Sequence, residues 1–198
     1  MDIQSPFVQR VLAHLPKQPV ADFVFTHWDA GKPTREVLGL LPVPGVDAER
    51  FLARVMDIDH YTGKIHHVEV SRTVPDATNE AGKRLRFYQR IKIPLVGNIH
   101  HELVIERLGT LQGYEVAAWT LLPKETAALD GKSAVRSEHN DGAWLVGPGV
   151  VGYALSSVPR REDVGFIKWQ ALTRGADVAA STAVRDNIKG MAAWASSA

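Results

Sequence analysis

The chain has 198 residues, of which 45% are hydrophobic and 23% charged. This is the composition of an ordinary globular domain, and it excludes disordered, collagen-like and coiled-coil classes. Lys and Arg number 23 against 22 Asp and Glu, so the net charge is +1 and the basic excess typical of nucleic-acid-binding domains is missing. The absence of cysteine excludes disulfides, zinc–cysteine sites, iron–sulfur clusters and thiol catalysis.

The start of the sequence has no basic segment followed by an apolar run, so it does not resemble a secretory signal. No apolar stretch approaches the roughly 20 residues that a membrane-spanning helix needs. We therefore expect a cytoplasmic protein without an integral membrane segment.

The first predicted element is a helix over residues 5–15, with Ser5 as its N-cap and Pro6 in its first position. Its apolar side chains follow helical spacing: Phe7, Val8, Val11, Leu12 and Leu15. We interpret residues 1–19 as an N-terminal helical extension and residues 20–198 as the main domain.

Two strands are predicted next, over residues 20–28 and 36–43, separated by turn residues. Asp47 is then a good N-cap for a second helix, Ala48–Met56, with Glu49 in its positive first turn.

Strand signals dominate from there to about residue 173. Apolar and basic residues alternate over residues 84–93, which is typical of a sheet with one wet face. Residues 99–108 and 114–122 flank a glycine-containing turn and predict a hairpin. Further strands are expected over 144–146, 150–155 and 166–172, with turns at Asp130-Gly131 and Asp141-Gly142.

The period changes again near the end, where a helix is predicted over about residues 177–195. Its apolar face consists of Val184, Ile188, Met191 and Ala195. The order of elements predicts an α+β fold in which helices pack against a curved antiparallel sheet.

This order and three of its stretches resemble the START-like superfamily, which includes Bet v 1-like proteins, polyketide cyclases and lipid-transfer proteins. The stretches are residues 51–61, a short helix ending in an Asp-Ile-Asp-His-Tyr turn; residues 91–101, a strand, a proline-containing loop and a returning strand; and a strand pair ending near residues 173–175, with the long helix that follows. The resemblance covers about residues 20–196. One departure is that His100, His101 and Glu102 stand where family members often have a basic–acidic pair.

The resemblance implies the helix-grip fold, a curved antiparallel sheet wrapped around a long C-terminal helix with an internal cavity. Strand alternation and the helix face then give the expected lining: Phe87, Gln89, His101, Leu103, Ile105, Arg107, Trp119, Tyr153, Ile167, Trp169, Val184 and Ile188. An inward Arg107 would hold a ligand carboxylate or phosphate, whereas at a strand end it would lie in solvent. The loop Pro94–Asn98 is the expected gate.

The implied function is binding of a hydrophobic small molecule or lipid, with transfer of that ligand and transient membrane contact as an extension of it, and no nucleic acid is expected as a partner. The alternative is a polyketide cyclase or aromatase in which His101, Tyr88, Tyr153 or Arg107 moves protons in the same cavity. A third possibility is an interaction module with a filled core. No catalytic set can be assigned, and neither a cofactor nor a metal is expected.

Three weaker motifs favour structural roles. Residues 147–152 match G-x-G-x-x-G, but strand-forming residues follow where a dinucleotide-binding unit needs a helix. A metal site from His66 or His67 with His101 and Glu69 or Glu102 lacks metal-ligand spacing. The cluster Asp57, Asp59, His60 and Tyr61 would act as an acid–base group at a pocket mouth or, as the simpler interpretation, cap and pack a turn.

Overall fold

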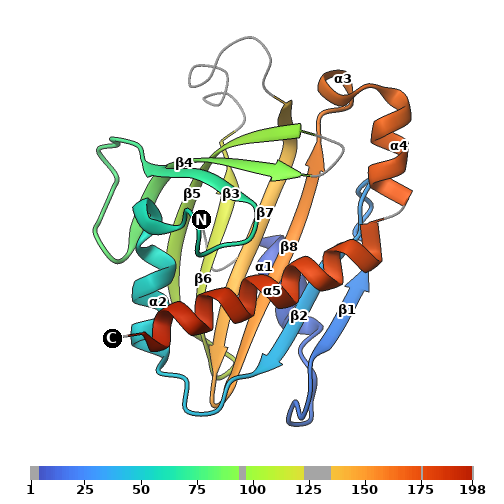
Figure 1. Cartoon of the computed structure of the whole chain (residues 1–198). Coiled ribbons are helices and arrows are strands. Elements are labelled where there is room, and N and C mark those ends of the chain that lie inside the picture. The colour runs from blue at the N-terminus through green and yellow to red at the C-terminus, as the bar shows by residue number, and fades with distance from the viewer. Residues whose placement is uncertain (1–4, 94–96, 123–134, 175, 198) are drawn as a thin grey trace.

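The computed structural model describes residues 5–93, 97–122, 135–174 and 176–197. Its strands are β1 (Val24–Trp28), β2 (Glu36–Pro42), β3 (Val68–Thr73), β4 (Arg84–Ile93), β5 (Gly97–Leu111), β6 (Tyr114–Leu121), β7 (Val135–Gly147) and β8 (Val150–Pro159). They form one curved sheet in the order β1-β2-β8-β7-β6-β5-β4-β3, with antiparallel neighbours (Figure 1). A short parallel pairing joins β5 to β7 at Ile99–Val135.

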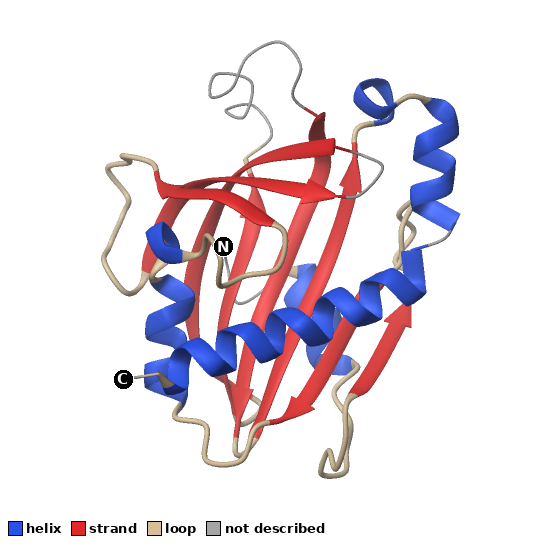
Figure 2. Ribbon diagram, in the orientation of Figure 1, coloured by secondary structure: helices blue, strands red, loops and turns tan. Residues whose placement is uncertain are grey.

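The helices are α1 (Pro6–Ala13), α2 (Ala48–Met56), the 3-10 turn η1 (Ile58–His60), α3 (Arg161–Val164), α4 (Phe166–Arg174) and α5 (Ala176–Ser196). Helix α5 runs across the concave face of the sheet, with α2 at its C-terminal end and α1 behind the sheet (Figure 2). This is the predicted α+β helix-grip architecture. Among the helices of the described residues, none is both long and apolar enough to cross a bilayer.

Local chemistry explains the element ends. The Asp47 carboxylate accepts a hydrogen bond from the Arg50 backbone N–H, so the predicted N-cap of α2 is confirmed. Ser5 precedes α1 but makes no side-chain cap, and Pro6 occupies the first turn as predicted. The β5–β6 hairpin turns at Gln112 and Gly113, both with positive φ (50° and 82°), as a tight hairpin turn requires.

Two apolar cores lie on opposite faces of the sheet. On the convex face, four side chains of α1 pack against both central and edge strands: Phe7, Val8, Val11 and Leu12. On the concave face, α2, α5 and the inner strand residues form a larger cluster. The N-terminal helix therefore shares a core with the sheet.

The strand predicted over Phe166–Leu172 is wrong, because these residues begin helix α4. Strand β8 already pairs with β7 on one side and β2 on the other, so the sheet offers no neighbouring edge for another strand here. A period-two pattern of only four or five residues fits a helix equally well, and Phe166 and Ile167 are exposed on it.

The turn predicted at Asp141-Gly142 is also wrong, because both residues lie inside β7. Gly142 is needed there by packing: a Cβ atom would lie 1.9 Å from Cζ2 of Trp119. Gly147 to Gly149 form the β7–β8 hairpin, with Gly149 at φ 71°, so the G-x-G-x-x-G match is a turn between strands. Asp130-Gly131 and the loop tip Pro94–Val96 lie outside the described residues.

Candidate functional site

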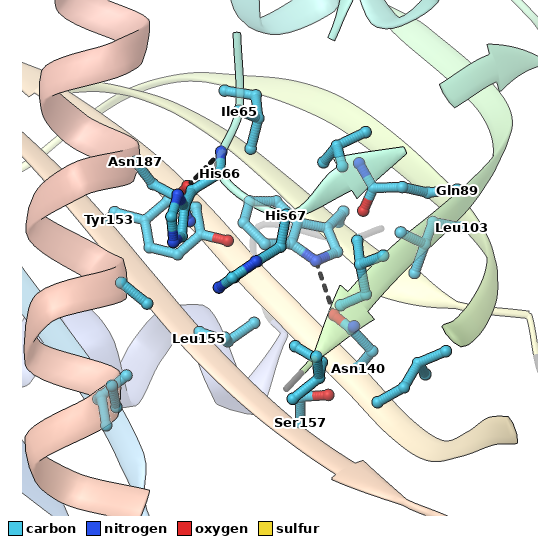
Figure 3. Close-up of a pocket in the computed structure, with 18 of the residues that line it drawn as sticks. Ile65, His66, His67, Gln89, Leu103, Asn140, Tyr153, Leu155, Ser157 and Asn187 are labelled. Carbon is cyan, nitrogen blue, oxygen red and sulfur yellow. Dashed lines mark hydrogen bonds between the residues drawn. The ribbon is translucent and has the colours of Figure 1, made fainter. Parts of the chain in front are cut away.

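A cavity of about 570 Å³ lies between the concave face of the sheet and α5, which is within the range of about 300–1,000 Å³ for small-molecule pockets (Figure 3). Most of its wall is apolar. The apolar lining residues of the sheet are Val37, Val68, Phe87, Ile91, Ile93, Ile99, Leu103, Ile105, Trp119, Trp144, Tyr153, Leu155 and Pro159. Tyr61 and Ile65 add the segment that follows η1, and Ala180 and Ala183 add α5.

Strand alternation places these side chains. Along β4, Phe87, Gln89 and Ile91 face the cavity, while Arg86 and Arg90 form ion pairs on the other face with Glu102 and Glu69. The same period on β8 brings Tyr153, Leu155 and Ser157 to the cavity. The alternation of side chains along these pleated strands thus produces the cavity wall.

Three aromatic rings form the floor of the cavity. The ring centroid of Tyr153 lies 5.5 Å from that of Trp119 and 4.5 Å from that of Trp144. Gly142 leaves the space into which the Trp119 indole fits. Such edge and tilted aromatic pairs bury much apolar area in fixed rotamers, which keeps this part of the wall rigid.

A polar cluster interrupts the apolar wall at Asn140. Its Oδ1 accepts a hydrogen bond of 2.9 Å from Trp119 Nε1, and its amide nitrogen lies 3.3 Å from His101 Nδ1. Burial, and to a smaller extent the charge of His100, lowers the pKa of His101 to about 3. His101 is therefore a neutral imidazole at physiological pH.

A second polar pair joins the sheet to α5. Asn187 Oδ1 accepts a 3.0 Å hydrogen bond from the His66 backbone N–H (Figure 3). Burial raises the pKa of Tyr153, and a hydrogen bond with the Asn187 side chain lowers it by a smaller amount. The phenol stays protonated and can offer its hydroxyl to a ligand.

The rim of the cavity carries the charged lining residues. Asp29, Lys32 and Arg35 come from the turn between β1 and β2, and His66 and His67 come from the segment before β3. His67 has φ 64°, an uncommon conformation for a residue with a Cβ atom. Burial lowers the pKa of His67, with a smaller contribution from His66, whose ring centroid lies 3.8 Å away.

Six of the twelve predicted site residues line the cavity: Phe87, Gln89, Leu103, Ile105, Trp119 and Tyr153. His101 shares the inner face of β5 but is completely buried and does not line the cavity, although its Nδ1 lies 3.3 Å from the amide nitrogen of Asn140, which does. Arg107 lies further along the same face, where Glu49 of α2 accepts two hydrogen bonds from its guanidinium at 2.5 and 3.1 Å. Arg107 is thus engaged at the end of α2 and does not line the cavity.

The four remaining predicted residues do not line the cavity, for two reasons. Ile167 and Trp169 belong to α4, and Ile167 is 83% exposed. Val184 and Ile188 are buried in the core beneath α5, where Val184 packs on Gly39 of β2. The helix turns the neighbouring stripe, Ala180, Ala183 and Asn187, toward the cavity.

Several lining residues were missed, and some carried a usable signal. Trp144 begins the strand predicted over residues 144–146, and extending that strand back to Asn140 would have placed both side chains on one face. Ala180, Ala183 and Asn187 are a helical stripe of small or polar residues beside the apolar face. His67 and Ile65 lie in an irregular segment that no periodicity places.

The weaker motifs have structural partners. Asp57 pairs with His60 at 2.6 Å, Asp59 accepts hydrogen bonds from Thr73, and Tyr61 donates to the Val55 carbonyl. Tyr88 faces away from the cavity and lies 2.6 Å from His100 Nδ1. Within the described ranges, no three His, Asp or Glu side chains gather as a metal site would require.

Comparisons with known proteins agree on the fold. No protein-family model matches the sequence, and no curated protein matches it significantly. Among solved structures, a STAR-related lipid transfer protein from Xanthomonas axonopodis superposes with a TM-score of 0.70 at 14% identity, over 91% of this chain and 97% of that one. Human STARD10 gives 0.69 at 13% identity, over 92% and 76%. Human StAR-related lipid transfer protein 5 gives 0.62 at 8% identity, over 89% and 85%. The chain therefore has the helix-grip fold of START-related lipid-transfer domains.

Proposed function

We propose that this protein binds a hydrophobic small molecule or lipid in the cavity beneath α5 and carries it between membranes through the cytoplasm. The observation that carries the proposal is the cavity itself, about 570 Å³ of space walled mainly by apolar side chains. An empty apolar cavity loses dispersion contacts on every wall, so an apolar ligand that fills it gains both those contacts and the hydrophobic free energy of leaving water. The similar solved structures named as lipid transfer proteins support the same reading.

The ligand contacts that we propose are the six predicted residues that line the cavity, together with Trp144, Leu155 and Asn187. The aromatic floor would provide most of the apolar contact, and Gln89, Asn140 and Asn187 would orient the ligand. The cyclase alternative is less well supported, because Tyr88, His101 and Arg107, three of its four proposed proton-transfer groups, do not line the cavity.

The direct test is native mass spectrometry of the purified protein, with organic extraction and identification of whatever is bound. We expect an apolar molecule at one-to-one stoichiometry. In the variant Ala183→Phe, a ring enters the cavity from α5, and we expect the bound molecule to be lost. Ala193→Phe places the same ring on the exposed side of α5 and should leave binding intact. Equal binding by both variants would contradict the assignment of the cavity.

We further propose that α4 contacts the membrane during exchange. Phe166 and Ile167 are 50% and 83% exposed, beside the exposed cations Arg161 and Lys168. Helices α3 and α4 follow directly from Ser157 and Pro159, which line the cavity. An apolar pair flanked by cations suits the interface of an anionic bilayer.

This contact can be measured by sedimentation with vesicles of phosphatidylcholine and phosphatidylglycerol. Ile167→Ser should reduce vesicle binding several-fold, whereas Val24→Ser, at an exposed apolar residue on β1, should not change it. Equal losses in both variants would remove α4 from the proposal.

A further inference from the structure

The cavity separates its charged groups from its interior. Its charged lining residues in the described chain are Asp29, Lys32 and Arg35, and all three belong to the turn between β1 and β2. None of the lining residues on β4, β5, β6, β7 or α5 carries an acidic side chain, a lysine or an arginine. These strands and α5 therefore contribute no charged carboxylate, ammonium or guanidinium group to the cavity. The charged groups of the lining are confined to the turn between β1 and β2.

The two cations of that turn are already engaged. Lys32 Nζ lies 3.3 Å from Glu36 Oε1 and 3.4 Å from Asp141 Oδ2, and it donates to Ser156 Oγ at 3.2 Å. Arg35 Nη1 lies 2.9 Å from His27 Nε2. A ligand anion that reached Lys32 would have to compete with two carboxylates that this cation already holds.

The interior nevertheless contains hydrogen-bonding groups, and they are uncharged. They are the amides of Gln89, Asn140 and Asn187 and the hydroxyls of Tyr153 and Ser157. Asn140 and Asn187 use their carbonyl oxygens for Trp119 and for the His66 backbone, which fixes their orientation. Among the described residues, the Gln89 side chain has no hydrogen-bond partner, and it points into the cavity beside Leu103 (Figure 3).

These groups distinguish between classes of amphiphile. A carboxylate or an ammonium ion taken into an uncharged wall loses its hydration shell, and neutral amides replace that loss only in part. A hydroxyl or carbonyl group loses much less, and one or two amide hydrogen bonds replace it. His67 faces the same space, but burial lowers its pKa, so at neutral pH it adds no positive charge for an anion.

We infer that the cavity takes a ligand whose buried polar end is an uncharged hydroxyl or carbonyl group, and that it discriminates against ionised carboxylates and amines of the same chain length. The inference rests on the proposed function and adds the chemical class of the ligand to it. Gln89 is the residue placed to recognise that group, since its amide is the unpartnered one on the interior wall.

The test is a pair of probes that differ only at one end, dodecan-1-ol and dodecanoate, titrated calorimetrically at pH 8. Quenching or shift of tryptophan fluorescence from Trp119 and Trp144 provides a second readout inside the cavity. We expect the alcohol to bind at least about tenfold more tightly than the carboxylate. Gln89→Leu, which keeps the approximate shape but removes the amide, should weaken the alcohol about fivefold, in line with one hydrogen bond.

The variant Gln89→Lys sharpens the test, because it places a cation on the interior wall and should reverse the preference in favour of dodecanoate. Thr182→Lys adds the same charge on the exposed side of α5 and should leave the preference unchanged. Unfolding midpoints of both variants show whether the fold is intact.

The outcomes separate the two proposals. Tight binding of dodecanoate by the unaltered protein, or a preference that Gln89→Lys does not change, would overturn the inference about ligand class while supporting the cavity as a binding site. Binding of neither probe, with no co-purifying molecule, would overturn both.

Discussion

On the convex face of the sheet, α1 places Phe7, Val8, Val11 and Leu12 directly against the strands and leaves a filled core. On the concave face, α5 contacts β2 and β8, and the space over β4, β5 and β6 is a cavity. Strands β2, β6, β7 and β8 contribute buried apolar side chains to both faces, so the composition of these strands does not decide which face is hollow. The covering helices do: α1 presents large side chains to the sheet, whereas α5 presents Ala180 and Ala183 to the cavity.

A matched pair of leucine truncations tests most strongly the contrast between the filled convex face and the hollow concave face. Leu145 is fully buried in the convex core, whereas Leu155 borders the cavity and is half-buried. Leu145→Ala should lower the free energy of unfolding by about 3–5 kcal/mol, since it creates a new void in a packed region. Leu155→Ala should cost about 1–2 kcal/mol, because its side chain already faces empty space. Urea denaturation measures both, and equal costs would contradict the contrast between the faces.

The ion pair beneath α1 should give the next largest effect. Glu36 is fully buried and accepts hydrogen bonds from Arg10 at 2.7 and 2.8 Å and from Trp28 at 2.9 Å. Glu36→Gln should destabilise the protein by about 3 kcal/mol, because it leaves the Arg10 charge without its partner. Arg10→Met in the same background should recover part of the loss, and a double-mutant cycle measures the coupling.

The same carboxylate gives a pH dependence. Burial raises the pKa of Glu36, but hydrogen bonds from Arg10 and Trp28, with the charges of Arg10 and Lys32, lower it below the ordinary value of 4.5. Since the pKa is lower in the folded state than in the unfolded one, the stabilisation is complete above pH 4.5 and declines as the pH falls below it. The acid limb of a stability–pH curve should therefore be shallower in Glu36→Gln.

A smaller effect is expected from Tyr61, which belongs to the concave side. Tyr61 is buried, and its hydroxyl donates to the Val55 carbonyl at the end of α2. Tyr61→Phe should lower the free energy of unfolding by about 1 kcal/mol, the contribution of one hydrogen bond. Thermal unfolding detects a change of this size, and no change would show that water replaces the phenol at that carbonyl.

The smallest effect concerns Arg107, predicted from strand parity to anchor a ligand. Its guanidinium pairs with Glu49, whose side chain is 73% exposed, so Arg107→Ala should change stability by less than about 1 kcal/mol. It should also leave the dodecan-1-ol affinity unchanged. A tenfold loss of that affinity would mean that Arg107 reaches the ligand after all.

The order of elements was predictable because each has its own period: alternation over residues 84–93 gave β4, and helical spacing over residues 177–195 gave most of α5. Parity also assigned the inner face of β4, β5 and β6 correctly. Parity does not say how far along a strand the cavity extends, so Arg107 on the correct face still lies beyond it, under α2.

The errors have a common physical origin in tertiary context. Which stripe of α5 faces the cavity depends on how closely the helix approaches β2, and Gly39 permits that approach: a Cβ atom there would lie 2.3 Å from Cγ1 of Val184. The strand predicted at residues 166–172 failed because both edges of β8 were already paired. Whether a face is filled or hollow is likewise set by the opposing helix, and no periodicity within a strand contains that information.

The Glu36 carboxylate connects two parts of the molecule that otherwise lie on opposite sides of the sheet. One oxygen, Oε1, is shared by Arg10 of the N-terminal helix and by Lys32 of the turn that lines the cavity. Displacement of Lys32 therefore changes the electrostatic field at Arg10. Thermodynamic reciprocity requires that detachment of α1 changes the conformational equilibrium of the β1–β2 turn by the same free energy. A ligand that contacts this turn would therefore bind a shortened protein lacking the first fifteen residues with a different affinity, although no residue of the cavity wall had been changed.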